Sequence, residues 1–379
     1  MEIIFLLGAG QAFFFALLLF GKNNASQNHK LLIAFFFLTG LVLIDHFFKQ
    51  TGLVFTHPHL LGIAYTLPII LGPILYYYTK SLTNKTETKL FPQFLIHSLP
   101  FLSLTTFFIY DFYFLNSEAK LDYYLKETEG ETSTIIFLAE FFLNFSVPSY
   151  SVVSLLVLSR HKKRIKQNFS NTENIDLHWL RIVLICMIII SFISLTTGYF
   201  SDYLEYFPFW VGDNILYSSL TVVIYFLGYY GIMQKIIFSN KMNEVVDINN
   251  AEPTKPKYAK SILKVEEMEL YISRLKEYMK NKKPYLSENL SLQQLAGCLE
   301  IAPNKLSQVI NEGLNKNFYD LTNEYRIEEI KNKISDPNYA HYSLLGLAFE
   351  CGFNSKSTFN NVFKQLTGKT PSEYRKSIS

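Results

Sequence analysis

The sequence predicts an all-α protein with a bundle of about seven transmembrane helices, followed by a separate, charged helical domain. Hydrophobic residues make up 49% of the chain and charged residues only 18%, which is typical of a protein partly solvated by lipid. The composition also changes sharply near Ile237, because long apolar runs precede it and charged sequence follows it. We therefore divide the chain into an N-terminal membrane domain (1–236), a linker (237–261) and a C-terminal domain (262–379).

Seven apolar runs approach the length of about 20 residues that a helix needs to cross the hydrocarbon core of a bilayer. The first is predicted to be a retained span and not a secretory signal, because Glu2 precedes it and no Ala-x-Ala cleavage site follows it. The seven predicted spans are approximately 3–20, 31–48, 60–78, 94–115, 135–158, 180–200 and 211–233.

The basic residues of the short loops predict the orientation of this bundle. Lys and Arg resist translocation, so loops rich in them stay in the cytoplasm. The first, third and fifth loops are the basic ones, and the fifth contains Arg160, Lys162, Lys163, Arg164 and Lys166. We expect a multi-pass protein of the cytoplasmic (inner) membrane, with its N-terminus outside and its C-terminal domain in the cytoplasm. The net charge of +3 says little about a nucleic-acid partner.

A few ionisable or polar residues lie within the predicted spans, where they are costly and usually face the bundle interior. Glu140, Asn144 and Pro148 follow one another at spacings of four and so share one helix face. Glu140 and Asn144, together with His97, are the candidate sensing residues, and the pair Asp45/His46 is a weaker one. The alternative is that these side chains only form hydrogen bonds between helices or lie at the interface.

No enzymatic, metal or cofactor site is predicted. The three cysteines, Cys186, Cys298 and Cys351, are far apart and lack CxxC spacing, so we interpret them as packing residues. The motifs HExxH and GxSxG and the phosphate-binding glycine loops are all absent from the sequence.

An apolar stripe precedes the C-terminal domain core. Val265, Met268, Ile272, Leu275 and Met279 alternate at spacings of three and four residues, a helical pattern that suits either a short coiled coil or packing into the domain that follows. We favour packing, because two heptads are short for a coiled coil.

Two copies of a helix-turn-helix pattern follow, at about 291–311 and 343–364. Such a unit needs a small residue where its helices cross, a turn a few residues later, and an apolar face on the second helix. In the first copy these roles fall to Ala296, Glu300 and Pro303, with Leu306, Val309 and Ile310 buried. In the second copy they fall to Ala348 and Gly352, with Ser355 as helix N-cap and Phe359, Val362 and Phe363 buried.

The last hundred or so residues resemble the AraC/XylS family of transcription regulators. The resemblance is carried by Gly352-Phe353-Asn354-Ser355, Phe359, Phe363-Lys364, Gly368, Pro371 and Tyr374-Arg375, and by Asn323-Glu324-Tyr325-Arg326-Ile327 in the position of the family's connecting helix. It implies two helix-turn-helix units on a rigid linking helix, each placing one recognition helix in the major groove of DNA.

The resemblance also implies which residues face DNA. These are Asn304, Lys305, Ser307, Gln308 and Asn311 on the first recognition helix, and Ser355, Lys356, Ser357, Thr358, Asn360, Asn361 and Lys364 on the second. Asn361 and Gln308 stand where Arg is frequent in the family. Because Asn and Gln prefer adenine whereas Arg prefers guanine, we expect A-rich contacts. The alternative is that these polar residues are merely a solvated face.

The sequence therefore predicts a membrane-embedded, DNA-binding transcription regulator that couples a membrane or extracytoplasmic signal to transcription. The expected partners are double-stranded DNA, the lipid bilayer, a second copy of the chain in a homodimer, and RNA polymerase; the signal ligand is unknown. The dimer is expected because a single tethered module binds weakly. The alternative function is a membrane transporter, or a simple anchor, whose cytoplasmic domain is only regulatory.

Overall fold

The computed structural model describes residues 2–21, 27–83, 90–128, 134–173, 175–204, 210–249 and 265–378. Regular secondary structure in these ranges is helical, apart from one isolated antiparallel bridge between Phe169 and Ser291. The chain divides into two compact units. The first unit comprises Met1–Ser159 and Leu177–Glu252, and the second unit comprises Arg160–Asp176 and Pro253–Ser379.

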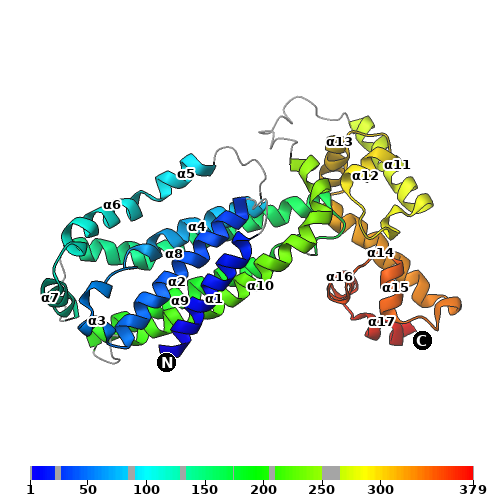
Figure 1. Cartoon of the computed structure of the whole chain (residues 1–379). Coiled ribbons are helices and arrows are strands. Elements are labelled where there is room, and N and C mark those ends of the chain that lie inside the picture. The colour runs from blue at the N-terminus through cyan, green and yellow to red at the C-terminus, as the bar shows by residue number, and fades with distance from the viewer. Residues whose placement is uncertain are drawn as a thin grey trace. The chain divides into compact units, whose positions relative to one another are not determined.

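The first unit contains the apolar helices (Figure 1). Its elements are α1 (Glu2–Phe20), α2 (Gln27–Gln50), α3 (Leu53–Thr56), η1 (Pro58–Leu60), α4 (Leu67–Thr83), α5 (Leu90–His97), α6 (Leu99–Phe108), the π-helical turn η3 (Ile109–Tyr113), α7 (Ser117–Thr128), α8 (Thr134–Asn168), α9 (His178–Leu204) and α10 (Trp210–Asn249). The last part of α8 belongs to the second unit.

Within the described ranges, five helices are long and apolar enough to cross a membrane. They correspond to the first, second, fifth, sixth and seventh predicted spans, so the prediction of seven continuous spans is not confirmed. The third predicted span is interrupted by a turn at Gly62, which has a φ of 72°, and α4 begins only at Leu67. The fourth is divided at Ser98, where Pro100 in the next turn lacks the N–H needed to continue a helix.

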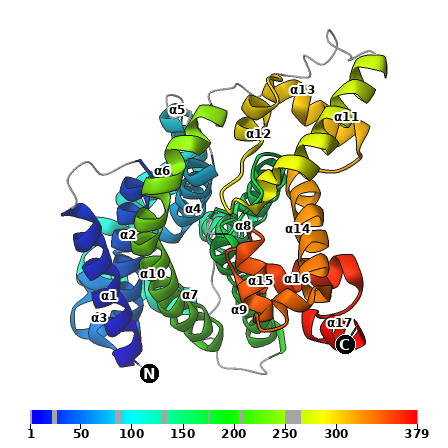
Figure 2. The ribbon, with the colours of Figure 1, turned by 90° about the vertical axis from the view of Figure 1, so that its right-hand side faces the viewer.

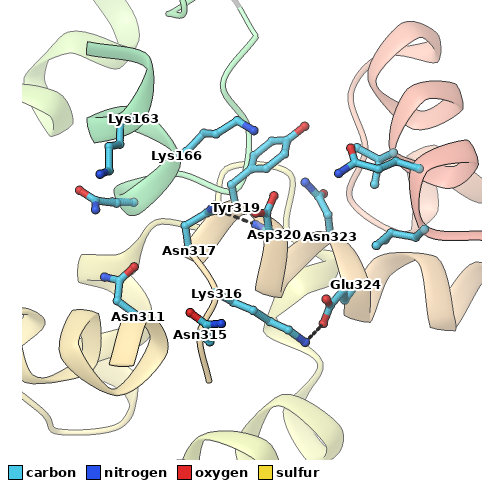
Figure 3. Close-up of a pocket in the computed structure, with 14 residues that line it drawn as sticks. Lys163, Lys166, Asn311, Asn315, Lys316, Asn317, Tyr319, Asp320, Asn323 and Glu324 are labelled. Carbon is cyan, nitrogen blue, oxygen red and sulfur yellow. Dashed lines mark hydrogen bonds and ion pairs between the residues drawn. The ribbon is translucent and has the colours of Figure 1, made fainter. Parts of the chain in front are cut away.

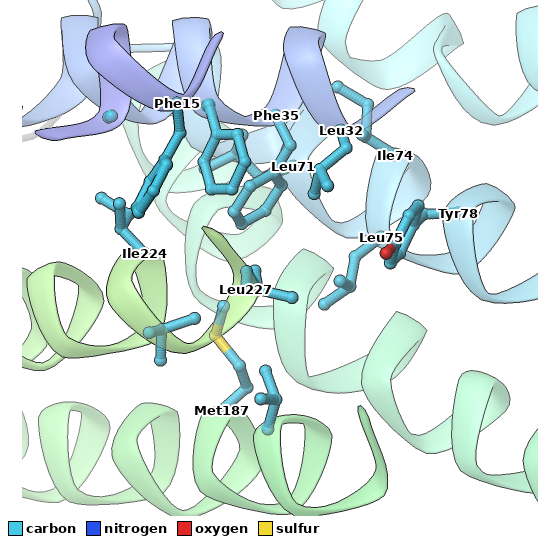
Figure 4. Close-up of a cluster of buried hydrophobic side chains, with 14 of the residues drawn as sticks. Phe15, Leu32, Phe35, Leu71, Ile74, Leu75, Tyr78, Met187, Ile224 and Leu227 are labelled. Atoms are coloured by element: carbon cyan, nitrogen blue, oxygen red, sulfur yellow. The ribbon is translucent and has the colours of Figure 1, made fainter. Parts of the chain in front are cut away.

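A large apolar core holds the long helices of the first unit together (Figure 4), and a smaller one forms around Val54, Phe108 and Phe112. Helix α1 packs against α2 and α10, α2 packs against α4, and α9 packs against α10. The helices approach closely where a small residue faces a large one: a Cβ on Gly228 of α10 would lie 2.0 Å from the Phe15 ring of α1. Such close approach increases the van der Waals contact between the helices.

Helix α10 continues to Asn249, so residues 237–249 of the predicted linker are helical. The physical reason is local: this stretch contains neither Pro nor Gly, and the first prolines are Pro253 and Pro256. The remaining part of the predicted linker, 250–261, lies outside the described residues.

The second unit contains short, charged helices (Figure 2). Helix α14 connects two pairs of helices, α12 with α13 and α15 with α16. The elements are α11 (Val265–Lys282), η5 (Pro284–Leu286), α12 (Leu292–Cys298), α13 (Pro303–Gln308), the π-helical turn η6 (Val309–Gly313), α14 (Phe318–Ser335), η7 (Pro337–Tyr339), α15 (Leu344–Glu350), α16 (Lys356–Thr367) and α17 (Pro371–Ile378).

The apolar stripe on α11 packs into this unit, as favoured from the sequence. Leu275 and Met279 are buried in the core around α12 and α13, and Met268 and Ile272 pack against its edge. Val265 is exposed. The stripe is thus largely used within one chain and leaves little apolar surface for a coiled coil.

The prediction that all three cysteines are packing residues is only partly right. Cys351 is buried, whereas Cys186 on α9 and Cys298 at the end of α12 are exposed. Helical periodicity places both exposed cysteines on outward faces, which residue type alone does not indicate.

Candidate nucleic-acid interface

The first helix-turn-helix unit forms at the residues that the sequence indicates. Ser291 caps α12 in a capping box with Gln294. The turn passes through Glu300, which has a φ of 56°, and Pro303 opens α13 where no N–H is required. The predicted small residue Ala296 is buried where the helices cross, and Leu306, Val309 and Ile310 are buried against it.

The second helix-turn-helix unit, formed by α15 and α16, repeats this arrangement with a turn that leaves no room for a side chain. Ser343 caps α15 and Ser355 caps α16, each accepting a hydrogen bond from a backbone N–H. The turn between the helices needs Gly352: its φ is 89°, and a Cβ there would lie 2.5 Å from the Tyr285 carbonyl oxygen. Phe359, Val362 and Phe363 of α16 are buried, as predicted.

Arg326 on α14 joins the two units. The side chain is 1% exposed, and burial lowers its pKa to about 10, so the guanidinium stays charged at neutral pH. Its Nε donates to the Tyr285 carbonyl at 2.8 Å and its Nη2 to the Ser287 carbonyl at 2.8 Å. The guanidinium carbon lies 5.6 Å from the centre of the Phe353 ring. One buried cation therefore contacts residues next to both helix-turn-helix units and orients them on a common helix.

The second recognition helix, α16, presents a row of polar side chains. Lys356, Ser357, Asn360, Asn361 and Lys364 are exposed, and Ser355 and Thr358 are half-buried. Their spacing places them opposite the buried face formed by Phe359 and Phe363. All seven predicted side chains thus lie on or beside one accessible face.

The first recognition helix is less open. Asn304 is exposed, but Lys305 binds Glu267 at 2.8 Å, and the Asn311 side chain donates to the Ser307 carbonyl at 2.8 Å. Gln308 is buried and donates to the Glu312 carboxylate at 2.8 Å. The roles of these residues in reading bases stay predictions. In this conformation Gln308 needs to exchange its partner before it can contact a base.

A polar cavity of about 400 Å³ lies in the second unit (Figure 3). Lys163 and Lys166, from the end of α8, line one side, and Tyr319 and Asn323 of α14 line another. Asn311 of the first helix-turn-helix unit and Gln365 of α16 also reach it. In the sequence, the basic residues after Ser159 indicate only the membrane topology, and no local pattern places them beside the recognition helices.

The three predicted sensing residues do not form one cluster. Glu140 is half-buried and Asn144 is exposed on α8, while His97, at the end of α5, bonds the Tyr150 hydroxyl at 2.7 Å. A more enclosed polar pair lies elsewhere: the buried His46 of α2 bonds Asn214 of α10 at 2.9 Å. The sequence ranked His46 low and missed Asn214, because nothing local indicates that α2 and α10 meet there.

Residues 295–377 match a family model described as a helix-turn-helix domain. Over 91 residues the chain is 32% identical to an uncharacterized HTH-type transcriptional regulator of Staphylococcus aureus (strain COL), covering 24% of this chain and 12% of that protein. Over 98 residues it is 30% identical to a raffinose operon transcriptional regulatory protein of Pediococcus pentosaceus, covering 25% of this chain and 34% of that protein. No solved structure matches the chain. The C-terminal part thus contains a helix-turn-helix domain of the kind found in transcription regulators.

Proposed function

We propose that this protein is a membrane-embedded transcription regulator that binds specific double-stranded DNA sequences through its tandem helix-turn-helix units. The observation that carries the proposal is the pair of recognition helices held on α14 by the buried Arg326. A rigid pair can enter two successive major grooves, because recognition helices of such units read base edges there.

The apolar helices of the first unit support embedding in a bilayer. Leu17 and Phe20 of α1 and Phe192 of α9 are 70%, 76% and 66% exposed. Large apolar side chains exposed to this degree are unfavourable in water and favourable in lipid. The match to the helix-turn-helix family covers only residues 295–377 and begins after this region, so the membrane assignment rests on these helices alone.

The proposed topology rests on two arguments. The basic cluster at the end of α8 belongs to the same compact unit as the helix-turn-helix domain, so both lie on the same side of the membrane. Basic segments stay in the cytoplasm, where DNA is found. We therefore place the second unit in the cytoplasm and the N-terminus outside.

Coupling to a signal completes the proposal. Buried polar contacts such as His46 with Asn214 join different helices of the first unit, and a ligand or lipid that rearranges them would shift the bundle. Glu140 and His97 are further candidate sensing residues. A homodimer formed through the membrane helices would raise the local concentration of DNA-binding modules. RNA polymerase would be the partner of the DNA-bound protein.

The test is selection from random duplex DNA with the full-length chain in lipid nanodiscs. We expect enrichment of one sequence with two half-sites about one helical turn apart. The matched control replaces Asn360 and Asn361 with Ala on the accessible face of α16. Equal recovery of all sequences by the unsubstituted protein would refute the proposed function.

A further inference from the structure

The segment Arg160–Asp176 comprises the end of α8 and the connection from α8 to α9, and it is part of the second unit. Its backbone docks on the start of the first helix-turn-helix unit: Phe169 and Ser291 form an antiparallel bridge, and the Ser170 N–H donates to the Leu290 carbonyl at 3.1 Å. Ser170 is buried. The docking is therefore a specific backbone pairing and not a loose surface contact.

Ser170 also completes the surroundings of Arg326. The guanidinium Nη1 donates to the Ser170 carbonyl at 3.2 Å, and Nη2 donates to the Ser170 hydroxyl at 3.1 Å. A buried charge without enough acceptors is strongly destabilising. Arg326, which joins the two helix-turn-helix units, thus depends for part of its hydrogen bonding on Ser170. Ser170 lies in a segment that is continuous at both ends with the apolar helices α8 and α9.

The same segment reaches the second recognition helix. The Glu173 carboxylate accepts a hydrogen bond from the Ser357 hydroxyl at 3.3 Å, and Ser357 is one of the residues predicted to face DNA. Lys166 lies 4.9 Å from the centre of the Tyr319 ring. Across the cavity in Figure 3, the end of α8 faces Asn311 of the first helix-turn-helix unit. The segment therefore occupies space beside both recognition helices.

We propose that the segment 160–176 and DNA compete for one face of the tandem helix-turn-helix domain, so that this segment controls DNA binding. The inference rests on the proposed function and names how the first unit regulates it. A carboxylate at Ser357 repels the phosphates that would approach the start of α16, since affinity for DNA depends on neutralising phosphate charge. Because the segment is continuous with α8 and α9, a movement of these helices can pull it away and free the interface.

The positive charges of Lys163 and Lys166 favour the opposite outcome, in which the segment helps to bind DNA. Both could attract phosphates and make the segment a part of the DNA-binding surface. We favour competition because the residue of the segment that accepts the hydrogen bond from Ser357 of α16 is an acid, Glu173, and because Lys166 lies over Tyr319 inside the domain.

A reversible covalent lock tests the competition in the full-length chain in nanodiscs. Phe169→Cys with Ser291→Cys places two thiols across the antiparallel bridge, where Cα atoms lie about 4.5–5.5 Å apart, within the range of a disulfide. Cys186→Ser and Cys298→Ser remove the exposed native thiols. The reduced and oxidised forms of one preparation are then compared on the duplex enriched by selection, and the reduced form controls for the substitutions themselves.

We expect the oxidised form to bind this duplex at least about tenfold more weakly than the reduced form, since a locked segment removes the competent state. Saturating DNA should also slow disulfide formation. Equal affinities, or tighter binding by the oxidised form, would overturn the competition. If the reduced form and the unsubstituted protein both fail to prefer any sequence, the proposed function fails, and this inference with it.

The charge of Glu173 provides a second, non-covalent test. We expect Glu173→Gln to tighten DNA binding about two- to fivefold, which corresponds to the loss of one exposed electrostatic contact. Glu266→Gln is the matched control, because it removes the same charge from an exposed position on α11. An equal effect of both substitutions would overturn the role assigned to Glu173.

Discussion

Replacing Arg326 with Lys should lower the free energy of local opening of the helices that surround Arg326 in the second unit. The guanidinium makes five hydrogen bonds, to the carbonyls of Tyr285, Ser287 and Ser170, to the Ser170 hydroxyl and to the Asn323 side chain. A Lys ammonium has three donors and no fork geometry, so at least two of these acceptors lose their donor inside the core. Breaking a buried charged contact costs about 3–5 kcal/mol, and we expect the lower end because Lys keeps the charge.

Hydrogen exchange measured by mass spectrometry on the full-length chain in nanodiscs checks this value. Exchange of α14 amides reports the free energy of local opening, and about 3 kcal/mol corresponds to roughly a hundredfold faster exchange. Arg375→Lys is the matched control, since Arg375 is half-buried and donates a hydrogen bond to the Tyr342 carbonyl at 3.0 Å. If Arg326→Lys changed α14 exchange no more than this control, the reasoning that Arg326 joins the two helix-turn-helix units would be refuted.

Three further predictions follow from single positions. Gly352→Ala should destabilise the second helix-turn-helix unit by about 1–3 kcal/mol, because its φ is 89° and the new Cβ meets a carbonyl. The control Gly297→Ala meets no atom within 4 Å and lies in α12, where Ala is the better helix former, so it should not destabilise the protein; exchange of α15 amides distinguishes the two substitutions. Asn361→Arg should shift the selected base opposite position 361 from adenine to guanine, and an invariant guanine already selected by the native chain would contradict the assignment. Cys298 should react with maleimide at pH 7.5 far faster than Cys351, because Cys351 is buried and burial raises its pKa to about 11. Raising the pH toward that value should increase Cys351 labelling. Equal rates at pH 7.5 would show that the core around Cys351, Phe359 and Phe363 is open.

The helix-turn-helix units could be located from the sequence because their determinants are local. Ser355 caps α16 through its own side chain, Pro303 opens α13, and Gly352 alone allows the turn after α15. The buried positions repeat with the helical period, so Phe359 and Phe363 could be assigned to the core. None of these assignments needs knowledge of a distant part of the chain.

The structure differs from the sequence-based expectations where those rested on hydropathy or charge and not on backbone geometry. The runs near Leu60 and Phe94 are apolar enough for spans, but Gly62 and Pro100 interrupt their backbone hydrogen bonding. The charged residues after Ile237 suggested a linker, although helix propensity there is unbroken until Pro253. Charge in such a stretch indicates solvent exposure and does not by itself indicate loss of helix.

The sequence alone determined the apolar and charged halves of this protein, the two helix-turn-helix units and the polar face of α16, because each depends on residue type and on spacings within a helix. Only the tertiary structure decided that Gln308 is turned toward Glu312, that His46 meets Asn214, and that Ser170 and Glu173 lie against Arg326 and Ser357. These are contacts between residues separated along the chain or choices among rotamers. They depend on how whole helices pack, which local patterns do not specify.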